Sequence, residues 1–191
     1  MSISEPTHMH PDIERVLLDA ETIRKRVREL GETIARDYSG RPVTLIGILK
    51  GCVLFLSDLA RSADMDCAMD FMSAASYSGD ASTGAVRLLL DLRQNIQGKH
   101  VLVIEDIVDT GLTLSYLQQN LRARQPASLE VCTLLDKPEC RKIRVQPKYV
   151  GFQIPNEFVV GYGLDYNEKY RELPYVGILK RSAVRKGEHS S

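Results

Sequence analysis

Residues 101–115, VLVIEDIVDTGLTLS, place three carboxylates and a glycine flanked by Thr110 and Leu112 directly after an apolar run. Like charges gathered at the end of a buried strand add no stability, so this stretch calls for a cation or a polyhydroxy, phosphorylated ligand. Glu105 and Asp106 could accept hydrogen bonds from the vicinal hydroxyls of a sugar, or hold Mg²⁺ through water. Burial of both carboxylates against Arg or Lys is the alternative interpretation.

The following residues, DTGLT at 109–113, open a predicted helix. Gly111 permits a tight backbone approach, the N–H groups of the first helical turn are free, and Thr110 and Thr113 add hydroxyls. This pattern indicates a nest for a phosphate monoester, strengthened by the helix dipole. Taken alone, DTG is also explained by an ordinary helix cap at Asp109 or Thr110. With Glu105-Asp106 just before it, the pattern favours a ribose 5-phosphate site.

The elements that must position these residues alternate between apolar strands and amphipathic helices. Helices are predicted at about 19–38, 53–60 and 112–124, and strands at 42–52, 66–72, 85–92, 101–105, 128–137, 149–152, 158–160 and 176–179. Strands without strict alternation, separated by helices, indicate an α/β fold whose mostly parallel sheet is covered on both faces. Ligands bind at the carboxyl ends of such strands, where Lys50-Gly51, residues 105–113 and Lys137 all fall.

The whole chain, 191 residues with 43% hydrophobic content, suits one domain. Lys plus Arg (25) equals Asp plus Glu (25), so we expect neither nucleic acid nor a membrane as partner. Residues 1–11 and 181–191 are predicted to be tails around a 12–180 domain, and no secretory signal opens the chain. The four cysteines form no CxxC pair, which indicates free thiols and a cytoplasmic protein.

The stretch VLVIEDIVDTGLT resembles the signature of type I phosphoribosyltransferases, which bind 5-phosphoribosyl-1-pyrophosphate. Further segments, namely LKG at 49–51, SY at 76–77, LLDKP at 134–138 and residues 150–179, are similar to hypoxanthine-guanine phosphoribosyltransferases. The resemblance spans roughly residues 12–180. It implies a central sheet with a small hood over the active site. It also implies transfer of phosphoribosyl to N9 of hypoxanthine or guanine with Mg²⁺ as cofactor, giving IMP or GMP, and a homodimer or homotetramer.

The resemblance also implies a role for each matching residue. Asp109 is implied as the general base near purine N7, and we expect exclusion of water to raise its basicity. The ribose and 5-phosphate are assigned to Glu105, Asp106, Asp109, Thr110, Gly111, Leu112 and Thr113. Pyrophosphate binding is assigned to Lys50, Gly51 and Arg171, and purine binding to Lys137, Phe158, Val159 and Asp165. Ser76 and Tyr77 are assigned to a mobile loop. Binding of Mg²⁺ is assigned to Glu105, Asp106 and Asp165.

Lys137 is implied as the donor to the purine 6-oxo group, which favours hypoxanthine or guanine over adenine because a 6-amino group would leave a buried cation unsatisfied. The resemblance also implies a cis peptide at Leu49–Lys50. The chain departs from the family at Cys52, where LKGG is usual, and at Leu112, where some members carry Lys. Two alternatives stay open, a xanthine-preferring transferase and a non-catalytic sensor of the phosphoribosyl donor.

Overall fold

The computed structural model of the protein describes residues 9–76 and 86–187. Its larger sheet has six strands in the order β4-β3-β2-β5-β6-β7. All neighbouring strands are parallel except β3 and β4, which are antiparallel. These strands are β2 (Val43–Leu49), β3 (Cys67–Ser76), β4 (Val86–Leu90), β5 (His100–Val108), β6 (Ser128–Asp136) and β7 (Tyr149–Gln153). The predicted α/β class with a mostly parallel sheet is confirmed.

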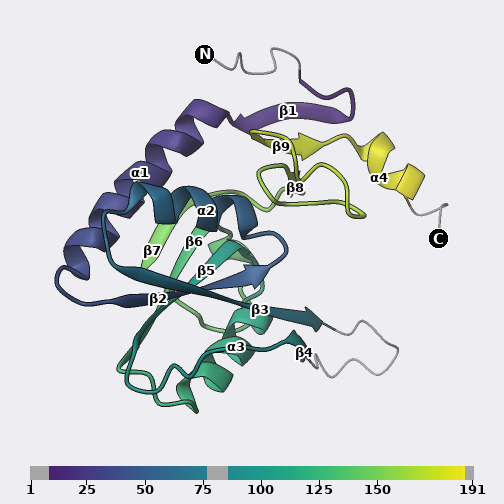
Figure 1. The fold of residues 1–191 in the computed structure, drawn as a ribbon. Coiled ribbons are helices and arrows are strands. Elements are labelled where there is room, and N and C mark those ends of the chain that lie inside the picture. Colours follow the sequence, from purple (N-terminus) through teal and green to yellow (C-terminus); the bar gives the residue numbers. More distant parts are fainter. Residues whose placement is uncertain (1–8, 77–85, 188–191) are drawn as a thin grey trace.

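Helices cover both faces of this sheet (Figure 1). Helices α1 (Ala20–Asp37) and α2 (Val53–Ser62) pack on one face, and α3 (Leu112–Arg122) packs on the other. Helix α1 begins where Asp19 accepts a hydrogen bond of 2.7 Å from the Thr22 amide. Its buried side chains recur at the helical spacing that the sequence predicted, at Ile23, Val27, Leu30 and Ile34.

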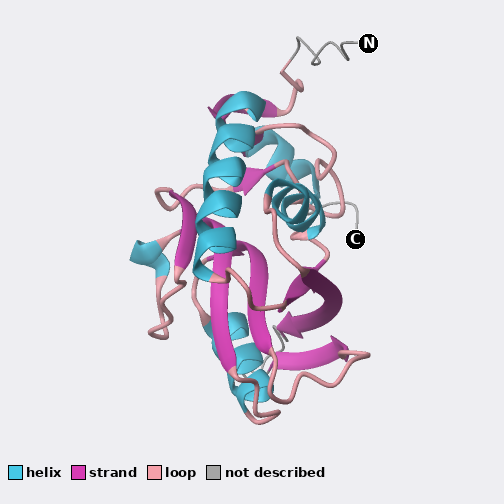
Figure 2. Ribbon diagram, turned by 60° about the vertical axis from the view of Figure 1, so that its left-hand side comes forward, coloured by secondary structure: helices cyan, strands magenta, loops and turns pink. Residues whose placement is uncertain are grey.

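A second, smaller sheet forms a hood, which we define as residues 9–18 and 158–187. It has the order β1-β9-β8, with antiparallel pairs. Its elements are β1 (Ile13–Leu18), β8 (Val159–Val160), β9 (Val176–Leu179) and helix α4 (Arg181–Gly187). Figure 2 shows α1 running beside the larger sheet, with the hood beyond the N-terminal end of that helix. The hood has its own apolar cluster around Ile13, Val160 and Tyr175.

Several elements differ from the prediction, among them β3, which runs to Ser76 and so beyond the predicted end at residue 72. Strand β1 was not predicted, because its pattern IERVLL is stabilised only by pairing with β9. Strand β5 continues to Val108, so Glu105 and Asp106 lie inside the strand rather than after it. The predicted tail at 181–191 begins with α4, whose Ala183 is buried against the hood. Within the described residues, no helix is long and apolar enough to cross a membrane.

Candidate active site

The carboxyl ends of β2, β5 and β6 lie side by side, because these strands are neighbours in the larger sheet. Lys50 follows β2, Asp109 follows β5 and Lys137 follows β6. The predicted convergence of these three strand ends on one edge is therefore confirmed. The chemistry of each group depends on what surrounds it there.

A small open pocket lies where β5 passes into α3. Its lining consists of Glu105, Ile107, Val108, Asp109, Thr110, Gly111, Thr113 and Leu114. The backbone is held from behind, since the amides of Lys142 and Ile143 both donate to the Thr110 carbonyl at 3.0 and 3.2 Å. Gly111 has φ +82° and directly precedes α3.

Gly111 is required at this turn for two reasons. A positive φ favours glycine, and a Cβ here would lie 2.7 Å from Val145 Cγ2 and 2.9 Å from the Ile143 carbonyl. The first turn of α3 thus borders a concave, glycine-lined surface, and its Leu112 amide makes a long hydrogen bond of 3.4 Å to the Thr110 hydroxyl. This shape suits the phosphate nest predicted for residues 109–113.

The carboxylates of Glu105 and Asp106 are in unusual surroundings. Glu105 is only 7% exposed. Burial, with the neighbouring Asp106 charge as a smaller cause, raises the pKa of Glu105 well above its usual range. Burial raises the pKa of Asp106 to about 6, although its hydrogen bond from the Ile107 amide opposes the rise. Neither carboxylate forms an ion pair in the described part of the chain, so the alternative of burial against Arg or Lys is not realised.

Lys137 and Asp109 approach each other across the ends of β6 and β5, with the Lys137 Nζ 3.8 Å from Asp109 Oδ2. The Lys137 side chain is 8% exposed and that of Asp109 is 48% exposed. Water therefore reaches Asp109 in this structure, and only bound substrates could exclude it. A buried ammonium beside an accessible carboxylate offers one hydrogen-bond donor and one proton acceptor at the same place.

Arg141 holds this pair in place, and sequence reasoning did not single it out. Its guanidinium forms an ion pair with Asp136, the last residue of β6, and donates to the carbonyls of Val108 (2.7 Å) and Asp109. It therefore connects the ends of β5 and β6. The residues around it, KPECRK, carry no local signal of this role, because its three partners are brought together only by the fold.

The carboxyl end of β2, which Lys50 and Gly51 follow, meets the hood. The peptide bond Leu49–Lys50 is cis, as predicted. Gly51 packs so closely on Asp106 that a Cβ would collide with the Asp106 carboxylate, and a Cβ on Gly163 would collide with the Gly51 carbonyl. Gly51 therefore lies between the core acid and the hood residues 161–171. Tyr162 strengthens this junction by donating to Asp58 of α2 at 2.7 Å.

The hood residues predicted to act here form one network of charges. Arg171 pairs with Asp165 at 2.9 Å and donates to the Gly163 carbonyl at 2.8 Å. Asp165 Oδ2 accepts the Glu168 amide at 2.8 Å, and Lys50 donates to Glu168 at 2.9 Å. Sequence reasoning missed Glu168, which lies on the loop between two residues that it did select.

The remaining predicted residues have different surroundings. Phe158 is 50% exposed and meets Tyr166 edge to face, with ring centroids 5.5 Å apart. Its free face could receive a planar base. Val159 is buried and pairs with Ile178 of β9. Ser76 ends β3, and Tyr77 lies outside the described residues.

The donors at this edge fit a Mg²⁺ that arrives with a phosphorylated substrate. No group of three His, Cys, Asp or Glu residues in the described ranges could hold a metal ion by itself. Both oxygens of Asp165 already have partners within the protein. Magnesium often binds through one or two carboxylates, water and substrate phosphates, so a protein-only cage is not required.

Comparisons with known proteins define the class. A model of the phosphoribosyl transferase domain matches residues 16–167. The chain therefore belongs to the phosphoribosyl transferase family, in agreement with the fold and with the glycine-lined turn beside Glu105 and Asp106.

Within that family, this chain is similar to proteins named hypoxanthine or hypoxanthine-guanine phosphoribosyltransferase. A hypoxanthine-guanine phosphoribosyltransferase of Mycobacterium avium is 50% identical over 184 residues, covering 92% of this chain and 91% of that protein. One of Staphylococcus epidermidis is 50% identical over 179 residues, covering 93% and 100%. Among solved structures, a Staphylococcus aureus hypoxanthine phosphoribosyltransferase has a TM-score of 0.88, with 49% identity and coverage of 92% and 96%. A Trypanosoma cruzi counterpart has a TM-score of 0.90, with 41% identity and coverage of 96% and 100%.

Proposed function

We propose that this protein transfers the 5-phosphoribosyl group of 5-phosphoribosyl-1-pyrophosphate to N9 of hypoxanthine or guanine, giving IMP or GMP and pyrophosphate. One observation carries the proposal. The Lys137 ammonium lies 3.8 Å from the Asp109 carboxylate, directly beside the glycine-lined turn that opens α3. A 6-oxopurine carries its 6-oxo group beside N7, so it needs a donor and a proton acceptor this close to each other, next to the site of the ribose phosphate.

The ribose 5-phosphate part of 5-phosphoribosyl-1-pyrophosphate is held by the residues at the end of β5 and the start of α3. The turn at 109–113 receives the 5-phosphate on its backbone N–H groups and threonine hydroxyls, and the Leu112 side chain adds no charge there. Glu105 and Asp106 accept hydrogen bonds from the ribose hydroxyls. These bonds stabilise the charge of two carboxylates whose pKa burial raises, and they add to the hydrogen bond that Asp106 already accepts from the Ile107 amide.

The base is recognised by its 6-oxo group. The Lys137 Nζ donates to this oxygen, whereas a 6-amino group would face a buried cation with no acceptor, a mismatch of the kind that gives discrimination on the order of 10⁴-fold. Phe158 stacks on the ring and Val159 lends backbone groups to its edge. Asp109 accepts the N7 proton as N9 forms its bond to C1′, and the C1′–O bond breaks with its electron pair leaving on pyrophosphate.

The leaving group is received by Lys50, Gly51 and Arg171. A Mg²⁺ arriving with the substrate would be held by Asp165, phosphate oxygens and water, and would supply positive charge beside the pyrophosphate. The Asp106 carboxylate packs against Gly51, so Glu105 and Asp106 would complete the shell of such an ion through water. The chain's own contribution is placement of two cations from different parts of the fold around one diphosphate.

The test is a direct assay. Purified protein, donor and Mg²⁺ are mixed with hypoxanthine, guanine, xanthine or adenine, and nucleotide formation is followed by ultraviolet absorbance. We expect turnover with hypoxanthine and guanine and at most trace turnover with adenine. Preference for xanthine would change the substrate, and no turnover with any base, while the donor still binds, would make the protein a sensor.

We further propose a homodimer or homotetramer in the cytoplasm. The Trypanosoma cruzi structure bears on the role of the C-terminal region in the oligomeric state of that enzyme, and this chain exposes large apolar side chains such as Leu89 (62%) and Met69 (45%). All four cysteines are unpaired, which supports a reducing compartment. Light scattering of the purified protein tests the assembly, and a monomer at micromolar concentration would contradict it.

A further inference from the structure

Glu168 lies between the two cations proposed to receive pyrophosphate. Lys50 Nζ donates to Glu168 Oε2 at 2.9 Å, and Arg171 Nη2 lies 3.4 Å from Glu168 Oε1. Lys50 follows β2 of the larger sheet, whereas Arg171 belongs to the hood. One carboxylate thus links the core to the hood, with one oxygen on each cation, in the way that a diphosphate would.

The backbone presents this carboxylate in an uncommon conformation. Glu168 has φ +61°, in the left-handed region that side-chain-bearing residues seldom adopt, and Asn167 has φ +51°. The Glu168 amide is fixed by Asp165 Oδ2 at 2.8 Å. A strained turn that directs an acid toward two cations of a proposed anion site indicates a functional constraint on that acid.

The contacts of Glu168 are suited to being broken. The side chains of Lys50 and Glu168 are 65% and 64% exposed, and exposed ion pairs are weak because water screens them. Arg171 keeps a donor in reserve, since its Nε is buried and has no hydrogen-bond partner among the described residues. A diphosphate offers more charge and more acceptor oxygens than one carboxylate, so it can replace Glu168 on both cations.

We infer that Glu168 is an internal competitor for pyrophosphate. Its carboxylate occupies Lys50 and Arg171 in the ligand-free protein and is displaced by the diphosphate of the donor or by the product pyrophosphate. The inference rests on the proposed function, which makes these two cations the pyrophosphate site. Its consequence is weaker retention of the product, because Glu168 returns to the cations as pyrophosphate leaves.

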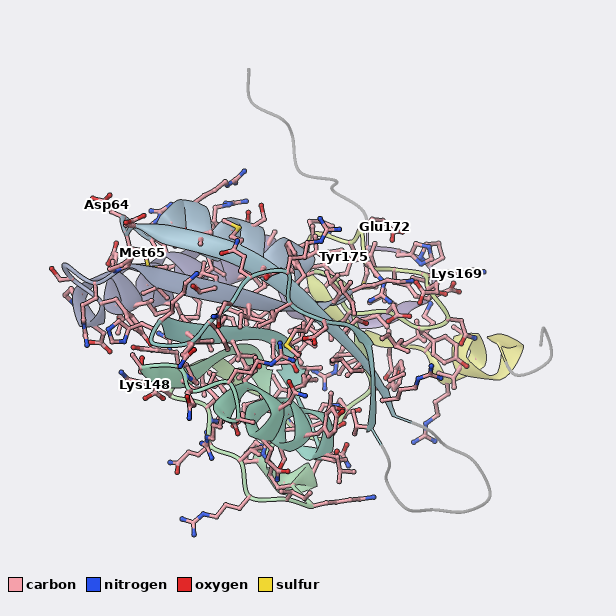
Figure 3. All side chains as sticks on the ribbon, turned by 60° about the horizontal axis from the view of Figure 1, so that its bottom comes forward. Asp64, Met65, Lys148, Lys169, Glu172 and Tyr175 are labelled. Carbon is pink, nitrogen blue, oxygen red and sulfur yellow. The ribbon has the colours of Figure 1, made fainter. Side chains whose placement is uncertain are left out.

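Calorimetric titration with sodium pyrophosphate, with and without Mg²⁺, tests this directly. The titration compares the wild-type protein with Glu168→Gln and with the matched control Glu172→Gln. Glu172 is exposed on the hood, as Figure 3 shows, and forms no ion pair in the described part of the chain. Both substitutions remove one negative charge from the same loop. We expect Glu168→Gln to lower the Kd for pyrophosphate about two- to fivefold, the range set by exposed ion pairs, and Glu172→Gln to change it less.

A cycle with Lys50→Met isolates the contact. In that background the gain from Glu168→Gln should shrink, because one of the two cations that Glu168 occupies is gone. Thermal unfolding of each variant checks that the fold is retained. In steady-state assays, Glu168→Gln should lower the inhibition constant for pyrophosphate by the same factor as the Kd.

The inference is overturned when the two Gln variants bind pyrophosphate equally, when Glu168→Gln binds it more weakly than the wild type, or when none of the three proteins binds it. Turnover of hypoxanthine by the wild-type protein tells failure of the competitor role of Glu168 apart from failure of the proposed function. Turnover of hypoxanthine with no effect of Glu168→Gln removes only the competitor role. Tighter pyrophosphate binding by Glu168→Gln without turnover removes only the proposed reaction.

Discussion

The acids of the core and the acids of the hood differ in how the protein compensates their charge. On β5, Glu105 is buried and Asp106 is partly buried, and neither forms an ion pair among the described residues. Loss of contact with water raises the pKa of both. Asp165 and Glu168 lie on the hood against Arg171 and Lys50. The hydrogen bond from Lys50 is the main cause that lowers the pKa of Glu168.

This difference separates the two halves of the site. The half of the site on the larger sheet is incomplete without a ligand, because Glu105 and Asp106 have neither hydroxyl donors nor a cation beside them among the described residues. The hood half is complete without a ligand, because its acids and bases neutralise one another and must be separated before a diphosphate enters. A rigid ribose site and an exchangeable pyrophosphate site are what a reaction needs when one product leaves and the nucleotide must stay oriented.

The largest effect should come from the core. Asp109→Asn keeps the shape of the side chain and removes the proton acceptor, so we expect kcat/KM for hypoxanthine to fall about 10²–10⁴-fold with little change in Tm. Asp64→Asn is the matched control and should leave activity unchanged, because Asp64 lies at the end of the molecule away from the hood residues Lys169, Glu172 and Tyr175 (Figure 3). Activity of Asp109→Asn within threefold of the wild type would reduce Asp109 to a backbone role.

A methyl group added at Gly51, where the larger sheet meets the hood, tests how closely the two parts pack. In Gly51→Ala the added Cβ collides with the Asp106 carboxylate, so we expect the free energy of unfolding to fall by about 1–3 kcal/mol. Urea denaturation measures the loss. The double variant Gly51→Ala with Asp106→Ala should be more stable than the sum of the two single effects, because the colliding carboxylate is gone. Simple additivity would contradict this packing.

Removing a core charge should stabilise the protein in a pH-dependent way. Folding raises the pKa of Asp106 from 3.8 to about 6. Ionisation of Asp106 therefore lowers the stability of the folded protein by the full amount above pH 6, and it has no effect below about pH 3.8, where the group is protonated in both states. Asp106→Asn cannot ionise, and we expect it to gain up to about 3 kcal/mol over the wild type between pH 4 and pH 6 and to keep this gain at pH 7.5.

Calorimetric Tm values with chelator present measure this difference, and donor binding should weaken in the same variant. An equal difference in Tm at pH 4.5 and pH 7.5 would show that the carboxylate carries no such penalty. The effect of pH is opposite for Glu168. Its pKa is lowered in the folded protein, so its ionised form stabilises the fold, and this contribution is lost as the pH falls.

The smallest effect should come from the contact between the hood and α2. Tyr162→Phe removes a hydrogen bond of 2.7 Å to Asp58 and should cost about 1 kcal/mol. Tyr166→Phe is the control, because its hydroxyl donates to the Val184 carbonyl within the hood. Hydrogen exchange should quicken across 161–171 only in Tyr162→Phe, while β5 stays protected in both. Equal exchange in the two variants would mean that the hood is held elsewhere.

Much of the fold and the centre of the site followed from local pattern. Apolar side chains at Ile23, Val27, Leu30 and Ile34 predicted α1 because burial repeats every turn of a helix. Buried runs predicted β2, β5 and β6, and adjacent parallel strands necessarily end at one edge. The residues EDIVDTGLT therefore indicated a phosphorylated sugar site before any contact was known.

The tertiary structure decided which charges meet. Lys50 and Glu168 are 118 positions apart, and Arg141 finds its three partners only where β5 and β6 end together. Strand β1 exists because β9 lies beside it, and β5 runs through its two carboxylates because β6 continues to pair with it as far as Val108. Local periodicity reports the burial of one element, whereas ion pairs and strand edges depend on loops that bring distant elements together.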